Sequence, residues 1–185
     1  MAQTLTGKKI AILVEKGFEQ VELEKPKAAL EEAGAQTHVI SPQSGKVKAW
    51  DMTDWGKEFD VDQDLKTAVA SDYDALLLPG GVMNPDYLRA NEQAVAFVRA
   101  FNDAGKPIAA ICHGPWTLIE AQAVSGKKMT SWPSLRTDLT NAGANWVDEE
   151  VVTDNGLVTS RKPDDIPAFN KKMIEEFAEG KHDRA

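Results

Sequence analysis

The chain has very little cysteine: Cys112 is the only one among 185 residues. A single thiol cannot form an internal disulfide, which excludes a disulfide-stabilised secreted scaffold. No apolar run approaches the roughly 20 residues that cross a bilayer, and the opening MAQTLTGKKIAILV lacks the long apolar segment of a signal peptide. These absences predict a cytoplasmic enzyme or binding protein without a membrane partner.

Positive charge is also in short supply. The sequence has 21 Lys and Arg against 29 Asp and Glu, a formal net charge of -8, and no basic patch interrupts the acidic balance. This balance argues against a nucleic-acid surface. The length and a hydrophobic content of 42% suit a single domain over residues 1–185 that buries a full core.

The sequence alternates short apolar runs with helical patterns. The apolar runs are typical of buried parallel strands, and they cover residues 8–14, 36–40, 74–81, 106–111 and 129–132. Apolar residues at helical spacing, in several cases closed by a glycine, follow over residues 23–33, 92–104, 116–124, 134–142 and 167–177.

Two further segments interrupt this alternation. Asn155-Gly156 between two β-branched runs predicts a tight hairpin over residues 149–160. The acidic segment 46–64 is interpreted as a hairpin or loop, followed by a short helix near residues 65–70. The whole pattern predicts an α/β fold, a mostly parallel sheet with helices on both faces.

Polar residues follow three of the predicted strands where each strand ends. Glu19 and Glu22 come after the first, Gly80-Gly81 after the third, and Cys112-His113 after the fourth. The functional crevice of an open α/β sheet lies beyond the carboxyl ends of its strands. We therefore expect these residues to form one site.

Cys112 lies in Ala110-Ile111-Cys112-His113-Gly114, where small residues on both sides leave room for a tight strand-to-helix turn. Such a nucleophile elbow exposes the sulfur near a helix N-terminus, which favours the thiolate. On this interpretation the thiol is partly ionised at neutral pH, with a pKa below its reference of about 8.5. The alternative is a packed, inert cysteine.

His113 is the histidine best placed to take a proton from the thiol or to pair with the thiolate. Its alternative is a turn histidine on the surface. His38 reads as an ordinary strand residue, and His182 is assigned no role. One cysteine and three scattered histidines show no recognised ligand spacing, so we predict neither a metal nor a cofactor.

Two further groups are candidates for the same site. The N–H groups of Gly80-Gly81 can approach an oxyanion closely because glycine has no Cβ. A Glu22 carboxyl near Cys112 must be protonated, or hydrogen-bonded to the sulfur, to avoid like-charge repulsion. Otherwise Glu22 is a solvated residue at a helix start.

Several motifs together give the chain a resemblance to the PfpI family, within the superfamily of the Parkinson-associated stress protein and the class I glutamine amidotransferases. They are GFEQVELEKP, LLLPGG, AAICHGP, GKKMTSWP, NAGANWVDEEVV and GLVTSRKPDD. The resemblance implies a flavodoxin-like three-layer sandwich with Cys112 as elbow nucleophile beside His113. It further implies that Glu22 hydrogen-bonds the thiol, and that the Gly81 and His113 amides form an oxyanion hole.

Two positions depart from the pattern of this family. Protease-type members complete a Cys-His-Glu triad with a glutamate from a neighbouring subunit, and the matching residue here is the shorter Asp86, in VMNPDYLR. This implies a homodimer or higher homo-oligomer, unless Asp86 only caps the helix that carries Tyr87 and Leu88. Where some relatives carry a histidine, this chain has Trp132, which makes the pocket rim more apolar.

The family includes intracellular peptidases, glyoxalase- or deglycase-type enzymes acting on dicarbonyl adducts, and redox-responsive stress proteins. The resemblance therefore implies a stress-response, cysteine-dependent hydrolase whose substrates are small carbonyl adducts or peptides. The alternative is a non-enzymatic redox sensor or holdase chaperone that acts through oxidation of Cys112 to a sulfenic or sulfinic acid. With one cysteine, any disulfide would be intermolecular.

Overall fold

The computed structural model describes residues 4–183 and is built on a central seven-stranded sheet. Every neighbouring pair in the sheet is parallel except β10 and β11, which form an antiparallel hairpin. In spatial order the strands are β10 (Val151–Asp154), β11 (Leu157–Ser160), β7 (Ile108–Ile111), β6 (Ala75–Leu78), β1 (Lys9–Leu13), β2 (Gln36–Ser41) and β5 (Gln63–Asp64).

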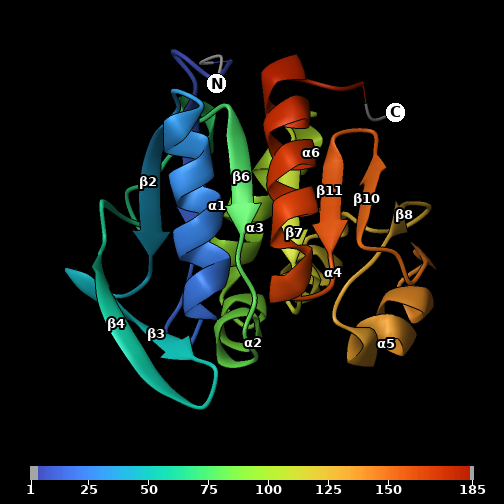
Figure 1. Cartoon of the computed structure of the whole chain (residues 1–185), viewed down its shortest axis with the longest axis horizontal. Helices are drawn as coiled ribbons and strands as arrows, with labels where there is room; N and C mark the ends of the chain where they lie inside the picture. Colours follow the sequence, from blue (N-terminus) through green and yellow to red (C-terminus); the bar gives the residue numbers. More distant parts are fainter. Residues whose placement is uncertain (1–3, 184–185) are drawn as a thin grey trace.

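Helices cover both faces of this sheet, as the alternating pattern predicts (Figure 1). In the figure, α1 and α6 lie in front of the sheet and α3 lies behind it. The helices are α1 (Gln20–Glu32), α2 (Met83–Arg89), α3 (Glu92–Asp103), α4 (Pro115–Glu120), α5 (Arg136–Asn141) and α6 (Ile166–Glu179). The predicted flavodoxin-like sandwich is confirmed.

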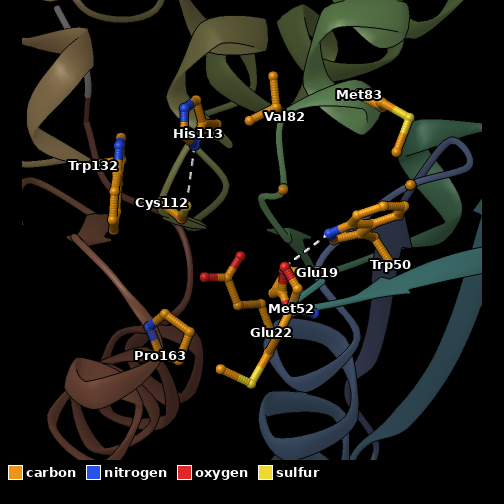
Figure 2. Close-up of a pocket in the computed structure, with 12 residues that line it drawn as sticks. Glu19, Glu22, Trp50, Met52, Val82, Met83, Cys112, His113, Trp132 and Pro163 are labelled. Atoms are coloured by element: carbon orange, nitrogen blue, oxygen red, sulfur yellow. Dashed lines mark hydrogen bonds between the residues drawn. The ribbon is translucent and has the colours of Figure 1, made fainter. Parts of the chain in front are cut away.

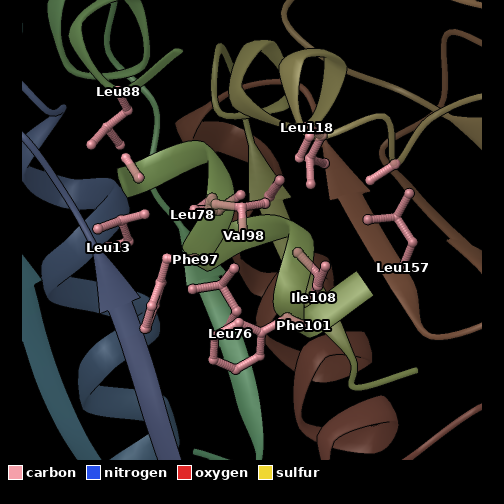
Figure 3. Packing of buried hydrophobic residues seen from close by; sticks show 14 of the residues in the cluster. Leu13, Leu76, Leu78, Leu88, Phe97, Val98, Phe101, Ile108, Leu118 and Leu157 are labelled. Atoms are coloured by element: carbon pink, nitrogen blue, oxygen red, sulfur yellow. The ribbon is translucent and has the colours of Figure 1, made fainter. Parts of the chain in front are cut away.

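The core is divided by the sheet into two apolar clusters. One joins the sheet to α1 and α6 and includes Leu23 and Phe169. The other joins it to α3 and α4, where Phe97 and Phe101 pack on Leu76 (Figure 3). All four residues of β6, and all four of β7, are buried because both faces of these central strands are covered.

Two predicted hairpins are present. The turn between β10 and β11 has φ values of 49° at Asn155 and 83° at Gly156, both left-handed, as a type I′ turn requires. The acidic segment forms β3 (Lys46–Asp51) and β4 (Asp54–Asp60), a separate antiparallel pair. A small parallel pair joins β8 (Lys128–Met129) to β9 (Asn145–Trp146).

Three predicted elements need correction. No α-helix forms over residues 65–70, because the Leu65 amide donates to the Ser41 carbonyl and the chain turns before a 3-10 helix at Ala70–Asp72. The helix after Cys112 ends at Glu120, since Gln122 adopts a left-handed φ of 57°. The predicted strand at 129–132 is only Lys128–Met129.

The topology places the loops that follow β1, β6 and β7 side by side at the carboxyl edge of the sheet. These three strands are adjacent and parallel, so their following segments leave the sheet in the same direction. Within residues 4–183, no helix is long and apolar enough to cross a bilayer.

Candidate active site

A cavity of about 490 Å³ lies where the three loops meet (Figure 2). Four of the predicted site residues, Glu22, Gly81, Cys112 and His113, line this cavity together. The other lining residues are Gly17, Glu19, Trp50, Met52, Val82, Met83, Trp132 and Pro163. The structure therefore brings the strand-end residues to one place, as their positions in the sequence predict.

Cys112 occupies a strained turn between β7 and α4. Its φ is 61°, a left-handed value that a non-glycine residue rarely adopts. Two backbone hydrogen bonds hold it there: the Cys112 amide donates to the Ser160 carbonyl at 3.0 Å, and the Trp132 amide donates to the Cys112 carbonyl at 2.9 Å. This backbone geometry is that of a nucleophile elbow.

The elbow depends on glycines that let backbone segments approach each other. A Cβ added to Gly80 would lie 2.7 Å from the Cβ of Cys112 and 2.7 Å from Oε1 of Glu22. A Cβ on Gly114 would lie 2.6 Å from the Leu78 carbonyl oxygen. A side chain at Gly80 would push Cys112 and Glu22 apart, and one at Gly114 would push the turn away from β6.

Glu22, in the first turn of α1, is completely buried and points toward Cys112 (Figure 2). Its Oε1 accepts a hydrogen bond from the Gly80 amide at 3.1 Å. Burial, with a smaller contribution from the negative charge of Glu19, raises the pKa of Glu22 to about 8. The carboxyl is therefore protonated at neutral pH, and the description of Glu22 as a solvated helix-start residue is wrong.

The prediction that the Cys112 thiol is partly ionised at neutral pH needs correction. Burial, followed by the negative charge of Glu22, raises the pKa of the thiol well above its ordinary value, and the Gly81 and His113 amides only partly oppose this. A protonated Glu22 exerts no such repulsion and can donate a hydrogen bond to the sulfur. Protonation of Glu22 therefore removes one of the effects that raise the thiol pKa, whereas burial, the largest of them, remains.

His113 is in contact with the sulfur. Its Nδ1 lies 3.1 Å from Sγ of Cys112, and its ring stacks on Trp132 at a centroid distance of 5.9 Å. The edge of Trp116 completes the enclosure at 5.2 Å. Burial lowers the pKa of His113 to about 4, so the imidazole is neutral at neutral pH and is able to accept a proton. It is not a surface turn histidine.

The Gly80-Gly81 turn presents amides to the site. Hydrogen bonds from the Gly81 and His113 amides to the sulfur favour the thiolate. Gly81 has a φ of 77°, and a Cβ there would lie 2.5 Å from the Gly17 carbonyl oxygen, so only glycine fits. The buried Asn84 holds the turn by donating from Nδ2 to the carbonyls of Pro79 and Gly80, each at 3.0 Å.

Sequence reasoning missed the other wall of the cavity. Trp50 and Met52 come from the β3–β4 hairpin, whose contact with the strand ends no local pattern indicates. Glu19 also lines the cavity, and its Oε1 accepts a hydrogen bond from the Met52 amide at 3.0 Å. Burial raises the pKa of Glu19 as well.

Asp86 does not reach the cavity of its own chain. It is exposed on α2 and is not among the lining residues. The alternative helix-capping role is wrong, because the N-cap of α2 is Val82 and no side-chain hydrogen bond caps this helix. Within residues 4–183, the cavity therefore has one carboxyl beside the sulfur, that of Glu22, and an apolar rim that includes Trp132.

Comparison with known proteins gives this arrangement a context. A sequence model described as the DJ-1/PfpI family matches residues 8–176. The chain is 48% identical over 170 residues to General stress protein 18 of Bacillus subtilis, covering 91% of this chain and 96% of that protein. It is 42% identical over 173 residues to Protein/nucleic acid deglycase 2 of Escherichia coli, covering 91% and 96%.

A solved structure shows the same architecture. DJ-1beta of Drosophila melanogaster superposes with a TM-score of 0.83 at 31% identity, covering 96% of this chain and 91% of that one. The similarity thus extends over nearly the whole length of both chains.

Proposed function

The chain belongs to the DJ-1/PfpI family, and we propose that it is a cysteine-dependent hydrolase of the stress response acting on small carbonyl adducts of amines. One observation carries this proposal: Cys112 is held at a strained elbow between a protonated carboxyl and a neutral imidazole. The similarity to a protein named as a deglycase supports the choice of substrate class.

Each polar group has a role in the proposed reaction. His113 Nδ1 takes the thiol proton across 3.1 Å, and Sγ attacks the electrophilic carbon. The Gly81 and His113 amides hold the oxygen of the attacked carbon. Protonated Glu22 donates to the sulfur and stabilises its charge until attack. The amine then leaves with the proton from His113.

The atoms balance for an aminocarbinol next to a ketone. Sulfur displaces the amine and leaves a hemithioacetal on Cys112. A proton shift between the two carbons converts this species to the thioester of a 2-hydroxy acid. Water then hydrolyses the thioester, which releases the acid and regenerates the thiol. A peptide bond would follow the shorter route through an acyl thioester.

The walls of the cavity support a small substrate. Trp50, Met52, Val82 and Trp132 give an apolar lining around few polar groups, in a volume of about 490 Å³. A cavity of this size and character suits a small ligand. Peptidase action requires a segment of peptide to reach the sulfur of Cys112, a residue that is only 7% exposed. We therefore place small adducts first and peptides second.

A redox role is the second candidate, and the same geometry favours it. A sulfinate on Cys112 would accept hydrogen bonds from protonated Glu22 and from the amides that face the sulfur. The similarity to a protein named as a general stress protein agrees with this role but does not distinguish it from the hydrolase.

Parallel assays on one preparation test these functions. Amine release from a methylglyoxal adduct, cleavage of unstructured peptides and oxidation by peroxide are measured for the wild type, Cys112→Ser and Glu19→Gln. We expect adduct turnover that falls by roughly 10³-fold or more in Cys112→Ser and stays within a few-fold in Glu19→Gln. Peroxide oxidation of Cys112 without any turnover would favour the sensor.

A further inference from the structure

A second group of ligating side chains lies at the opposite edge of the sheet. Glu176 and Glu179 are on the last two turns of α6, and His182 follows the helix in the tail. Gly180, with a left-handed φ of 84°, ends α6 and turns the chain. Figure 1 shows that α6 runs away from the carboxyl edge, where the cavity lies, toward the amino edge.

The donor atoms of this group have the spacing of a metal site. Nε2 of His182 lies 3.2 Å from Oε2 of Glu176 and 3.6 Å from Oε2 of Glu179. All three ligand atoms lie within 4.8 Å of one another. Tetrahedral Zn²⁺ with bonds of about 2.0–2.2 Å places neighbouring ligand atoms about 3.3–3.6 Å apart.

Two of these three ligand atoms have no hydrogen-bond partner among the described residues. Glu176 is 9% exposed, and its Oε2 and the His182 Nε2 are buried atoms that make no hydrogen bond among the described residues. The two atoms lie 3.2 Å apart, at ion-pair distance, but neither one is engaged in a hydrogen bond within residues 4–183. A cation between them would satisfy both.

The charges around the group also favour a bound cation. Three glutamates, Glu175, Glu176 and Glu179, lie close together at the end of α6. Lys172 is already paired with Glu175 at 2.9 Å. A divalent cation would neutralise the two carboxylates that face His182.

Hydrogen bonds hold the backbone around His182 in place before any ion binds. The His182 amide donates to the Gly105 carbonyl at 2.8 Å, and the Asn155 side chain donates to the Asp183 carbonyl at 3.0 Å. A Cβ on Gly105 would overlap the His182 carbonyl oxygen, so glycine permits this close approach. Because the backbone is already fixed, ligand binding orders little additional chain.

We propose that Glu176, Glu179 and His182 bind one divalent transition metal ion of the Zn²⁺ type. A nitrogen and carboxylate oxygens are suitable ligands for this class of ion. Water completes the tetrahedron from the open side, where the Glu179 side chain is 61% exposed. The bound ion would clip the tail to α6 and, through Gly105, to the start of β7.

The test uses tag-free, metal-stripped protein carrying Cys112→Ser, which removes the one thiol that could also bind zinc. Zn²⁺ is titrated calorimetrically at pH 7.5, and Co²⁺ is added separately to record its visible spectrum. We expect one equivalent to bind, a tetrahedral Co²⁺ spectrum and a higher melting temperature. His182→Ala and Glu179→Gln should each weaken Zn²⁺ binding at least roughly tenfold.

Glu175→Gln is the matched control, since Glu175 lies on the same helix and is not among the proposed ligands. It should keep full affinity. Both ligand variants change exposed or tail side chains, and circular dichroism checks that they fold. Binding of equal strength in all variants would show an adventitious ion only. Either that result or no binding at all would overturn the proposal.

Discussion

The elbow cavity and the C-terminal cluster of Glu176, Glu179 and His182 contain the same kinds of side chain. They differ in how the negative charge of a buried carboxyl is neutralised. Each has a buried glutamate beside a second glutamate and a histidine, namely Glu22 in the cavity and Glu176 in the cluster. Glu22 is sealed from water and keeps a proton at neutral pH. Glu176 lies at the end of a helix that opens to solvent, where a cation can reach it.

The difference teaches that burial, more than residue type, decides how a carboxyl is neutralised. A proton needs no coordination shell and suits a tight space, whereas a metal ion needs three or four ligands and a path to water. The backbones differ too. The cavity uses a strained residue, Cys112, which costs on the order of 1–3 kcal/mol. The cluster uses a helix end that glycine closes without such strain.

The largest expected effect is a loss of activity that shows whether the active site needs a residue from a second chain. The C-terminal cluster, by contrast, takes all its proposed ligands from one chain. If Asp86 of a neighbouring subunit orients His113, then Cys112→Ala and Asp86→Ala chains are each inactive but complement each other. Random pairing in a two-fold dimer should restore roughly one quarter of wild-type activity. Mass spectrometry monitors subunit exchange.

Asp86→Ala also has a stability control. The side chain is exposed and caps no helix, so the free energy of unfolding should change by less than about 0.5 kcal/mol. Full activity of Asp86→Ala alone, or no recovery in exchanged mixtures, would leave Cys112, His113 and Glu22 of one chain as the whole site.

The next effect concerns the proton on Glu22. Glu22→Gln replaces an acidic hydrogen-bond donor with a weaker amide, so iodoacetamide alkylation of Cys112 at pH 7 should slow roughly tenfold or more. Above about pH 8, where Glu22 ionises, the alkylation rate of the wild type should rise less steeply with pH. The Glu22→Gln variant should show no such change of slope.

Glu19→Gln is the control for that measurement. Glu19 lines the same cavity but bonds to the Met52 amide. Its replacement should therefore alter the alkylation rate by less than about threefold, which corresponds to about half a unit in the pKa of the thiol. Equal changes at both positions would mean that the total charge of the cavity matters and the Glu22 contact does not.

The last test concerns the pH dependence of stability. The pKa of Glu22 is about 4.5 unfolded and about 8 folded, so between these values the native state holds a proton that the unfolded state lacks. Stability therefore falls as pH rises from about 5 to 8, by up to about 1.4 kcal/mol per pH unit from this group. Urea unfolding at several pH values, with a chelator present, measures the slope.

Two variants sharpen the comparison in that experiment. Glu22→Gln should flatten the fall in stability across this range. Glu176→Gln should flatten it much less, because Glu176 is nearer to solvent and faces His182. A larger change in the Glu176 variant would reverse the assignment of which carboxyl stores the proton.

Local sequence patterns determined most of the framework. Short apolar runs predicted β1, β2, β6 and β7, because a buried parallel strand is apolar on both faces. Small residues around Cys112 predicted the elbow, and Asn155-Gly156 predicted the hairpin turn between β10 and β11. Both conformations are set by the steric limits of a few adjacent residues. Strand order then brought the polar residues after the strands into one cavity.

Tertiary structure alone decided what those groups do. The pattern around Cys112 indicated a low thiol pKa, but the pKa follows the burial contributed by segments far away in sequence. Trp50 and Met52 reach the cavity on a hairpin that no strand-end argument included. His182 matched no ligand spacing, yet the turn at Gly180 and the contact with Gly105 place it beside two glutamates. Desolvation and long-range approach are properties of the folded chain, so a linear pattern does not record them.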